Sequence, residues 1–220
     1  SVRCFGTFTD DLYALRDWLQ SVGITTVAME STGIYWIPLY DVLSVSGIDV
    51  FLVNPREIKQ VPGRKYDIRD CQWIQELHSL GLLRAAFRPD DTSCEIRGLV
   101  RQRQEFIKSS VRQVHHMQKA LLQMNIQLPQ VVSDITGSTG LAIIRDIVAG
   151  ERDHFKLAQH RDCRCKKDEA TIARSLCGNW RKEHLLALSQ TLRLWDFYRT
   201  LIGEIERAIF ESIDARLQEY

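Results

Sequence analysis

A repeat of apolar positions between residues 96 and 128 constrains the fold most. Ten positions follow one another at alternating steps of four and three residues, and eight of them are apolar: Ile96, Val100, Arg103, Ile107, Ser110, Val114, Met117, Leu121, Met124 and Leu128. This heptad spacing predicts a long helix whose seam needs a partner. A second series at helical spacing follows at Leu188, Leu192, Trp195, Tyr198, Ile202, Ile205, Ile209 and Ile213. We expect the two helices to pack antiparallel as a coiled-coil-like hairpin.

The residues before the repeat alternate between strand and helix patterns. Strands are predicted at 2–9, 25–29 and 48–53. A first helix is predicted to be capped by Asp10 or Asp11, a second to carry Trp36 to Leu43, and a third to run from about 67 to 80 with Cys71 in its apolar stripe. This alternation favours an α/β domain.

The patterns divide the chain into four parts. Residues 1–88 form the α/β domain, 89–130 the first long helix, 131–180 a small helical insert, and 181–220 the second long helix. Within the insert, helices are predicted at 139–149 and 168–177, each followed by a glycine.

Composition excludes several classes of protein. Of the 220 residues, 45% are apolar and 26% charged, as in an ordinary globular protein. No apolar run approaches the roughly 20 residues that span a bilayer, so we expect no membrane segment. The six cysteines are irregularly spaced, which favours reduced thiols inside a cell.

Three acidic residues form the sharpest candidate site. Asp67 and Asp70 lie three apart, so they share a helix face, and Glu30 directly follows the strand at 25–29. Carboxylates at a strand end and a nearby helix start suit a two-metal phosphodiester site. The structural alternatives are that Asp67 caps its helix, that Asp70 pairs with Arg64 or Lys65, and that Glu30 lies in a solvated turn.

Several ordered motifs carry a family resemblance. They are Met29-Glu-Ser-Thr-Gly-Ile-Tyr-Trp36, Val53-Asn-Pro55, the stretch from Gly63 to Ile74, Ile135-Thr-Gly-Ser-Thr-Gly140, Ala149-Gly-Glu-Arg-Asp153 and the stretch from Arg164 to Lys166. Together they closely resemble the DEDD transposases, bacterial insertion-sequence recombinases that use a bridging guide RNA. The resemblance implies a RuvC-like domain of RNase H fold.

The resemblance also implies a Mg²⁺ site of four acids in the order Asp, Glu, Asp, Asp. Glu30, Asp67 and Asp70 match the last three. The first Asp belongs on an opening strand that we do not find here, and Asp10 and Asp11 do not match it. The family's C-terminal domain with its serine nucleophile is also absent. We therefore expect a fragment with a partial RuvC-like domain, inactive by itself.

A basic stripe on the first long helix predicts contact with nucleic acid. Its residues are Arg97, Arg101, Lys108, Arg112 and Lys119, and the only acid between its ends is Glu105. At about 100° per residue they fall in one narrow arc away from the apolar seam. A single-sign row suits phosphate contacts, whereas a merely solvated face usually mixes signs. Arg64 and Lys65, just before the aspartate pair, form a second candidate contact.

The favoured function is metal-dependent DNA cleavage and strand transfer by the intact transposase, with DNA and structured guide RNA as partners. A homo-oligomer through the seam and a bacterial cytoplasmic, nucleoid-associated location are expected with it. The main alternative is a non-catalytic RNA- or DNA-binding module. A nucleotide-binding turn at Glu30-Ser-Thr-Gly33 lacks a supporting Gly-rich loop with Lys. A zinc site at His160, Cys163, Cys165 and Cys177 has unusually tight Cys-x-Cys spacing.

Overall fold

A computed structural model describes residues 3–59 and 67–218 of the chain. The chain divides into two compact units, Ser1–Pro89 and Asp90–Tyr220. Each unit has its own cluster of buried apolar side chains.

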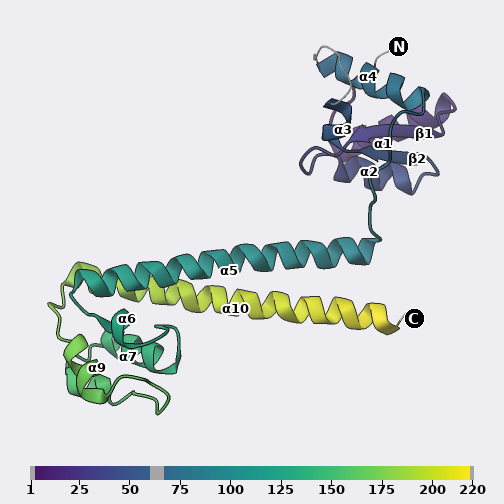
Figure 1. Cartoon of the computed structure of the whole chain (residues 1–220). Coiled ribbons are helices and arrows are strands. Elements are labelled where there is room, and N and C mark those ends of the chain that lie inside the picture. Colours follow the sequence, from purple (N-terminus) through teal and green to yellow (C-terminus); the bar gives the residue numbers. More distant parts are fainter. Residues whose placement is uncertain (1–2, 60–66, 219–220) are drawn as a thin grey trace. The chain divides into compact units, whose positions relative to one another are not determined.

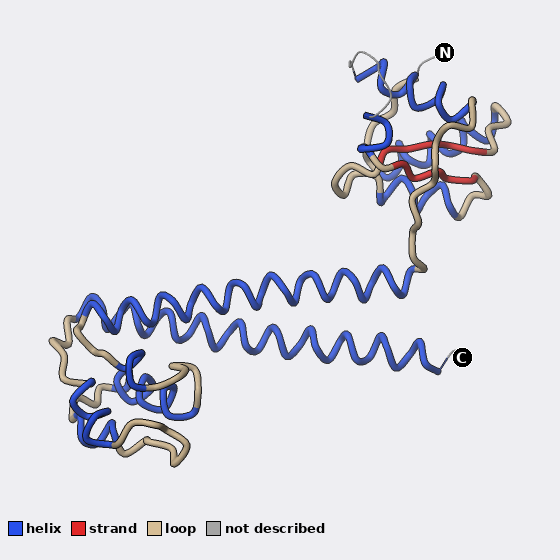
Figure 2. Tube along the Cα trace, in the orientation of Figure 1, coloured by secondary structure: helices blue, strands red, loops and turns tan. Residues whose placement is uncertain are grey.

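The first unit is built around two parallel strands. Its elements are α1 (Thr9–Ser21), β1 (Thr26–Glu30), α2 (Ile37–Ser44), β2 (Asp49–Val53), α3 (Pro55–Lys59) and α4 (Asp67–Ser79). The strands pair from Thr26 opposite Asp49 to Glu30 opposite Val53 (Figure 2). The strands predicted at 25–29 and 48–53 are therefore present.

Helices cover both faces of this small sheet. Successive side chains in a strand point to opposite faces. Met29 and Leu52 are buried together with Leu19 of α1. On the other face, the ring of His78 in α4 lies 4.7 Å from that of Phe51, and its Nε2 lies 2.9 Å from the Thr26 hydroxyl.

Two predictions for the first unit are wrong. The described residues 3–8 form no strand; instead the ring of Phe5 packs 5.5 Å from that of Trp18 on α1. Phe8 precedes the first turn of α1, so Asp10 and Asp11 lie inside the helix, where Asp11 accepts the Phe8 N–H at 3.3 Å.

Cys71 is exposed rather than part of the apolar stripe of α4. The buried face of this helix contains Ile74 and Leu77, 8% and 2% exposed. Asp70 precedes them at the spacing of four and three residues that defines one helix face, whereas Cys71 lies to the side of that face.

The described residues of the second unit form helices and the loops between them, with no strand. It contains α5 (Asp91–Gln123), α6 (Leu128–Val131), α7 (Ser138–Ala149), α8 (His154–Ala158), α9 (Glu169–Ser175) and α10 (Lys182–Gln218). Figure 1 shows α5 and α10 side by side. Arg103 pairs with Glu206 at 2.6 Å and Asp90 with Arg216 at 3.2 Å, so the two helices run in opposite directions. None of the helices in the described residues combines the length and the apolar composition of a membrane-spanning segment.

The long first helix ends earlier than the heptad pattern suggests. It stops at Gln123, and Asn125 adopts a left-handed backbone with φ 56°. Asn tolerates this conformation better than most residues and commonly ends helices. Leu128, the last seam position, therefore begins the separate helix α6.

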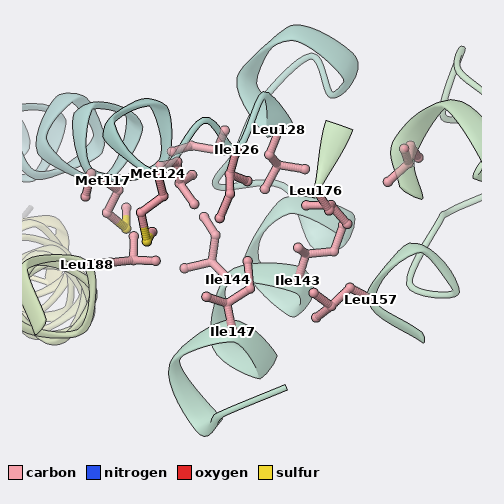
Figure 3. Packing of buried hydrophobic residues seen from close by; sticks show 14 of the residues in the cluster. Met117, Met124, Ile126, Leu128, Ile143, Ile144, Ile147, Leu157, Leu176 and Leu188 are labelled. Carbon is pink, nitrogen blue, oxygen red and sulfur yellow. The ribbon is translucent and has the colours of Figure 1, made fainter. Parts of the chain in front are cut away.

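The core of the second unit forms where α5 and α10 meet the insert. Met117 of α5, Leu188 of α10, and Ile143 and Ile144 of α7 are all fully buried. In Figure 3 Ile144 lies toward Met117 and Leu188, and Ile143 lies beside Leu157 and Leu176 in the same cluster. The Arg145 guanidinium adds two hydrogen bonds to Asp196, at 2.6 and 3.0 Å, which join α7 to α10.

Candidate active site and nucleic-acid interface

Glu30 ends β1 at the carboxyl edge of the sheet. Its side chain is half-buried, and a hydrogen bond joins the Thr32 hydroxyl to its Oε1. The turn that follows is fixed to β2, because the Ser31 N–H and hydroxyl donate to the Val53 carbonyl at 2.9 and 3.0 Å. Glu30 is thus held where open α/β sheets place ligands.

Helix α4 packs on the sheet face that contains Glu30. Thr26, Ala28 and Glu30 share one sheet face, because side chains alternate along a strand. The last turn of α4 lies on this face beside Thr26, through His78. From His78 back to Asp70 is about 12 Å of helix, and from Thr26 to Glu30 about 13 Å of strand. Asp70, which is half-buried, thus lies about as far along α4 from this contact as Glu30 lies along β1.

The other residues predicted for this region lie partly or wholly outside the described part of the chain. Asp67 is the first residue of α4, but its side chain is outside the part that the structure describes. Arg64 and Lys65 lie outside the described residues altogether.

The donor set of this region suits a hard divalent cation. Glu30 and Asp70 offer carboxylate oxygens, the ligand type that Mg²⁺ prefers. One oxygen of Glu30 accepts the Thr32 hydroxyl, which leaves the other for a ligand. Within the described residues, no three His, Cys, Asp or Glu side chains form a ready metal cluster.

All five residues of the basic stripe are exposed on α5. The row from Arg97 to Lys119 extends about 33 Å, close to one turn of a nucleic-acid duplex. Lys108 pairs with Glu105 at 2.7 Å, an exposed ion pair that salt readily screens. Arg97, Arg101, Arg112 and Lys119 have no ion-pair partner among the described residues. Their charges remain available to phosphate.

The cations of the insert are used differently. The Arg161 guanidinium donates to the carbonyls of Lys167 and Cys165 at 2.7 and 3.0 Å, so it holds the loop that contains them. His160 hydrogen-bonds Asp146 at 2.5 Å instead of joining the cysteines. Of those, Cys163 and Cys177 are exposed and Cys165 is half-buried.

Sequence reasoning missed Thr32, which contacts Glu30, and His78, which positions α4. Thr32 lies two residues after Glu30 in a turn sequence, where a hydroxyl often bonds a nearby acceptor. His78 gave no signal, because its partners Thr26 and Phe51 come from distant segments.

Comparison with known protein families shows the family to which the chain belongs. Residues 3–126 match the family of IS110-type DEDD transposases, described as transposase. The chain belongs to this family. The resemblance inferred from its motifs is therefore confirmed, and the transposase match includes both the α/β unit and α5. The family implies an RNase H-like fold, DNA binding and dependence on a divalent metal. A search of curated proteins finds no match.

Proposed function

We propose that this chain supplies metal-binding acids and a nucleic-acid-binding helix to a DNA transposase that cleaves and transfers strands. Glu30, Asp67 and Asp70 hold Mg²⁺ in this proposal. The observation that supports it most is the packing of α4 on the sheet face of Glu30, with His78 beside Thr26. Bound Mg²⁺ would stabilise charge on the oxygens of the scissile phosphate.

The acids act by orienting the cation rather than by moving protons. The Thr32 hydroxyl fixes the rotamer of Glu30, and the bonds from Ser31 to Val53 fix its backbone. Asp70 approaches from α4, which the buried Ile74 and Leu77 anchor to the unit. This rigid support keeps the carboxylates spaced for a cation before substrate arrives.

The test is Asp67→Asn with Asp70→Asn in an intact transposase that contains this chain. We expect loss of Mg²⁺-dependent strand transfer with retained DNA binding. Glu76→Gln is the matched control, because Glu76 is an exposed acid of the same helix. Unchanged strand transfer in the double variant would refute the assignment and favour a non-catalytic binding module.

The basic stripe of α5 contacts nucleic-acid phosphates in our proposal, and structured guide RNA is a ligand beside DNA. Fluorescence anisotropy with a labelled RNA hairpin and a labelled DNA duplex, at two salt concentrations, tests it. We expect salt-sensitive binding that Arg101→Glu with Arg112→Glu abolishes. The control Arg193→Glu with Arg207→Glu makes the same charge change at exposed positions of α10. If the stripe variant binds RNA and DNA as well as the α10 control variant does, the stripe is only a solvated face.

The hairpin of α5 and α10 is a coiled coil that also joins copies of the chain in this proposal. Leu194 and Phe197 on α10 are 47% and 57% exposed, which leaves apolar surface for a second copy. The expected location is the bacterial cytoplasm, at the nucleoid. Sedimentation of Leu194→Gln with Phe197→Gln against the unchanged chain measures the dimer, and equal mass for both would contradict it.

A further inference from the structure

A cavity in the insert lies outside everything assigned so far. Its volume is about 530 Å³, large enough for a phosphate with its sugar. Three parts of the chain line it: the end of α6 with the residues after it (130–134), the start of α7 at 137–139, and the basic loop that includes Asp162 and 164–167. We infer that this cavity binds a phosphodiester group of a nucleic-acid backbone.

The charge of the cavity is the first support. Its lining contains Arg164, Lys166 and Lys167 against Asp134 and Asp162. Lys166 and Lys167 are exposed and have no ion-pair partner in the described part of the chain. Two uncompensated ammonium groups at the rim of a concave surface attract an anion.

Both acids of the lining are already engaged. Asp162 pairs with Arg164 at 2.9 Å, and this hydrogen bond lowers the pKa of the Asp162 carboxyl well below its ordinary value. Asp134 accepts both the N–H and the hydroxyl of Thr136, at 2.8 Å each. Arg164 offsets the charge of Asp162, and Asp134 keeps its negative charge, so the two lysines leave the lining with a net charge of +1.

The start of α7 supplies a second set of donors. The N–H groups of Ser138, Thr139 and Gly140 have no acceptor among the described residues, and the preceding Gly137 offers no capping side chain. Ser138 and Thr139 line the cavity. Backbone N–H groups and a helix dipole directed at one anion add to the attraction of the lysines.

Hydrogen bonds hold the basic loop and the start of α7 in place around the cavity. Thr139 is 5% exposed, and its hydroxyl accepts the Asp162 N–H at 3.0 Å, which joins α7 to the basic loop. Arg161 fixes the same loop through two carbonyls, at 2.7 and 3.0 Å. The lysines and the helix start are therefore presented together before any ligand arrives.

The inference rests on the nucleic-acid binding proposed above but not on the stripe of α5. We would titrate the whole chain with inorganic phosphate and follow the backbone amide resonances of Ser138, Thr139 and Gly140. The expected shifts disappear in Lys166→Gln with Lys167→Gln. They persist in the matched control Lys156→Gln with Lys182→Gln, two exposed lysines outside the cavity lining. The shifts also persist in Arg101→Glu with Arg112→Glu. A wrong assignment of the stripe on α5 can therefore be distinguished from a wrong assignment of this cavity.

A second variant tests the backbone donors. Ser138→Pro removes one N–H at the first helical position, where Pro fits and Gly137 is already extended with ψ 172°. We expect weaker phosphate binding with an unchanged thermal midpoint. Shifts that are absent in the parent chain, or that are equal in the parent and the Lys166/Lys167 variant, would overturn the inference.

Polymer binding identifies the source of the phosphate. With a DNA duplex and an RNA hairpin in separate arms, Lys166→Gln with Lys167→Gln should lower the salt dependence by about one to two phosphate contacts for one of them. The polymer that responds is the ligand. If phosphate shifts the amides but neither polymer responds, the cavity takes an adventitious ion only, and the inference fails.

Discussion

Gly98 and Gly140 both lie in helices, yet an added methyl group meets different surroundings at each. At Gly98 in α5 a Cβ has nothing within 4 Å, whereas at Gly140 in α7 it would lie 2.4 Å from the Ile135 carbonyl oxygen. Gly98→Ala should raise the free energy of unfolding by about 0.5–1 kcal/mol, because Gly is a poor helix former. Gly140→Ala should lower it by about 1–3 kcal/mol, because the backbone at Ile135, before α7, must move. Urea denaturation of the two variants measures both, and a stabilised Gly140→Ala would contradict the tight turn.

Asp168 gives a prediction for pH. It precedes α9 and accepts the Thr171 N–H at 2.9 Å, and hydrogen bonds from Thr171 lower the pKa of its carboxyl below the ordinary 3.8. A carboxyl with a lowered folded pKa stabilises the fold above its unfolded pKa, and this contribution is lost as pH falls through the folded value. Asp168→Asn keeps a good cap but cannot titrate. The thermal midpoint of the parent should therefore fall relative to that of the variant below about pH 4, and a constant difference from pH 6 to 2.5 would contradict it.

The candidate site shows which residues a sequence can reveal. The place of Glu30 was predictable because a strand ends there, and the place of Asp70 because its spacing matches the helix face of Ile74 and Leu77. Their role as metal ligands stays a prediction. The packing of α4 on the sheet face of Glu30 was not predictable, since it depends on the contact of His78 with Thr26 across 52 positions. The prediction that Cys71 belongs to the apolar stripe was wrong by one position. Each position along a helix turns the side chain by about 100°, so Cys71 lies off the face that Asp70 shares with Ile74 and Leu77.

At the scale of the element, substitutions in α5 test which of its positions face the core. Leu121 is fully buried and its neighbour Leu122 is 43% exposed. Leu121→Ala should cost about 2–5 kcal/mol, since it leaves a cavity among side chains that relax little. Leu122→Ala should change the free energy of unfolding by less than about 1 kcal/mol. Chemical denaturation compares the two, and equal losses would show that the helix is rotated from the described packing.

The heptad predicted the buried face of α5 correctly near the end of the helix, but Val100 is 37% exposed and the helix is shorter than predicted. The seam positions Met117 and Leu121 are fully buried, as the pattern indicates. The apolar spacing continues past Gln123 through Met124 and Leu128, yet Asn125 turns the chain. The spacing of apolar residues indicates which residues are buried, not where a helix ends. A buried residue after a turn can fall at the same spacing as the residues of the preceding helix. The short helices α6 and α8 were missed because four or five residues hold too few turns for a period.

At the scale of the whole molecule, the distribution of buried side chains differs between the two units. Among the described residues, the core of Asp90–Tyr220 contains 17 buried residues, all from that unit, and the main core of Ser1–Pro89 contains five. Large apolar side chains such as Tyr35 and Phe87 are 84% and 89% exposed in the first unit. Burial of apolar surface is the dominant stabilising contribution, so the first unit should be the less stable of the two.

This asymmetry predicts two unfolding transitions for the whole chain. Residues 90–220 produced alone should unfold at the midpoint of the upper transition, because no member of their core comes from the first unit. Calorimetry of the whole chain and of the two separate pieces measures this. Leu121→Ala serves as the marker, because it should lower the upper transition and leave the lower one in place. A single transition that Leu121→Ala moves as a whole would mean that the two units unfold together, and the division at Asp90 would then not be a boundary in stability.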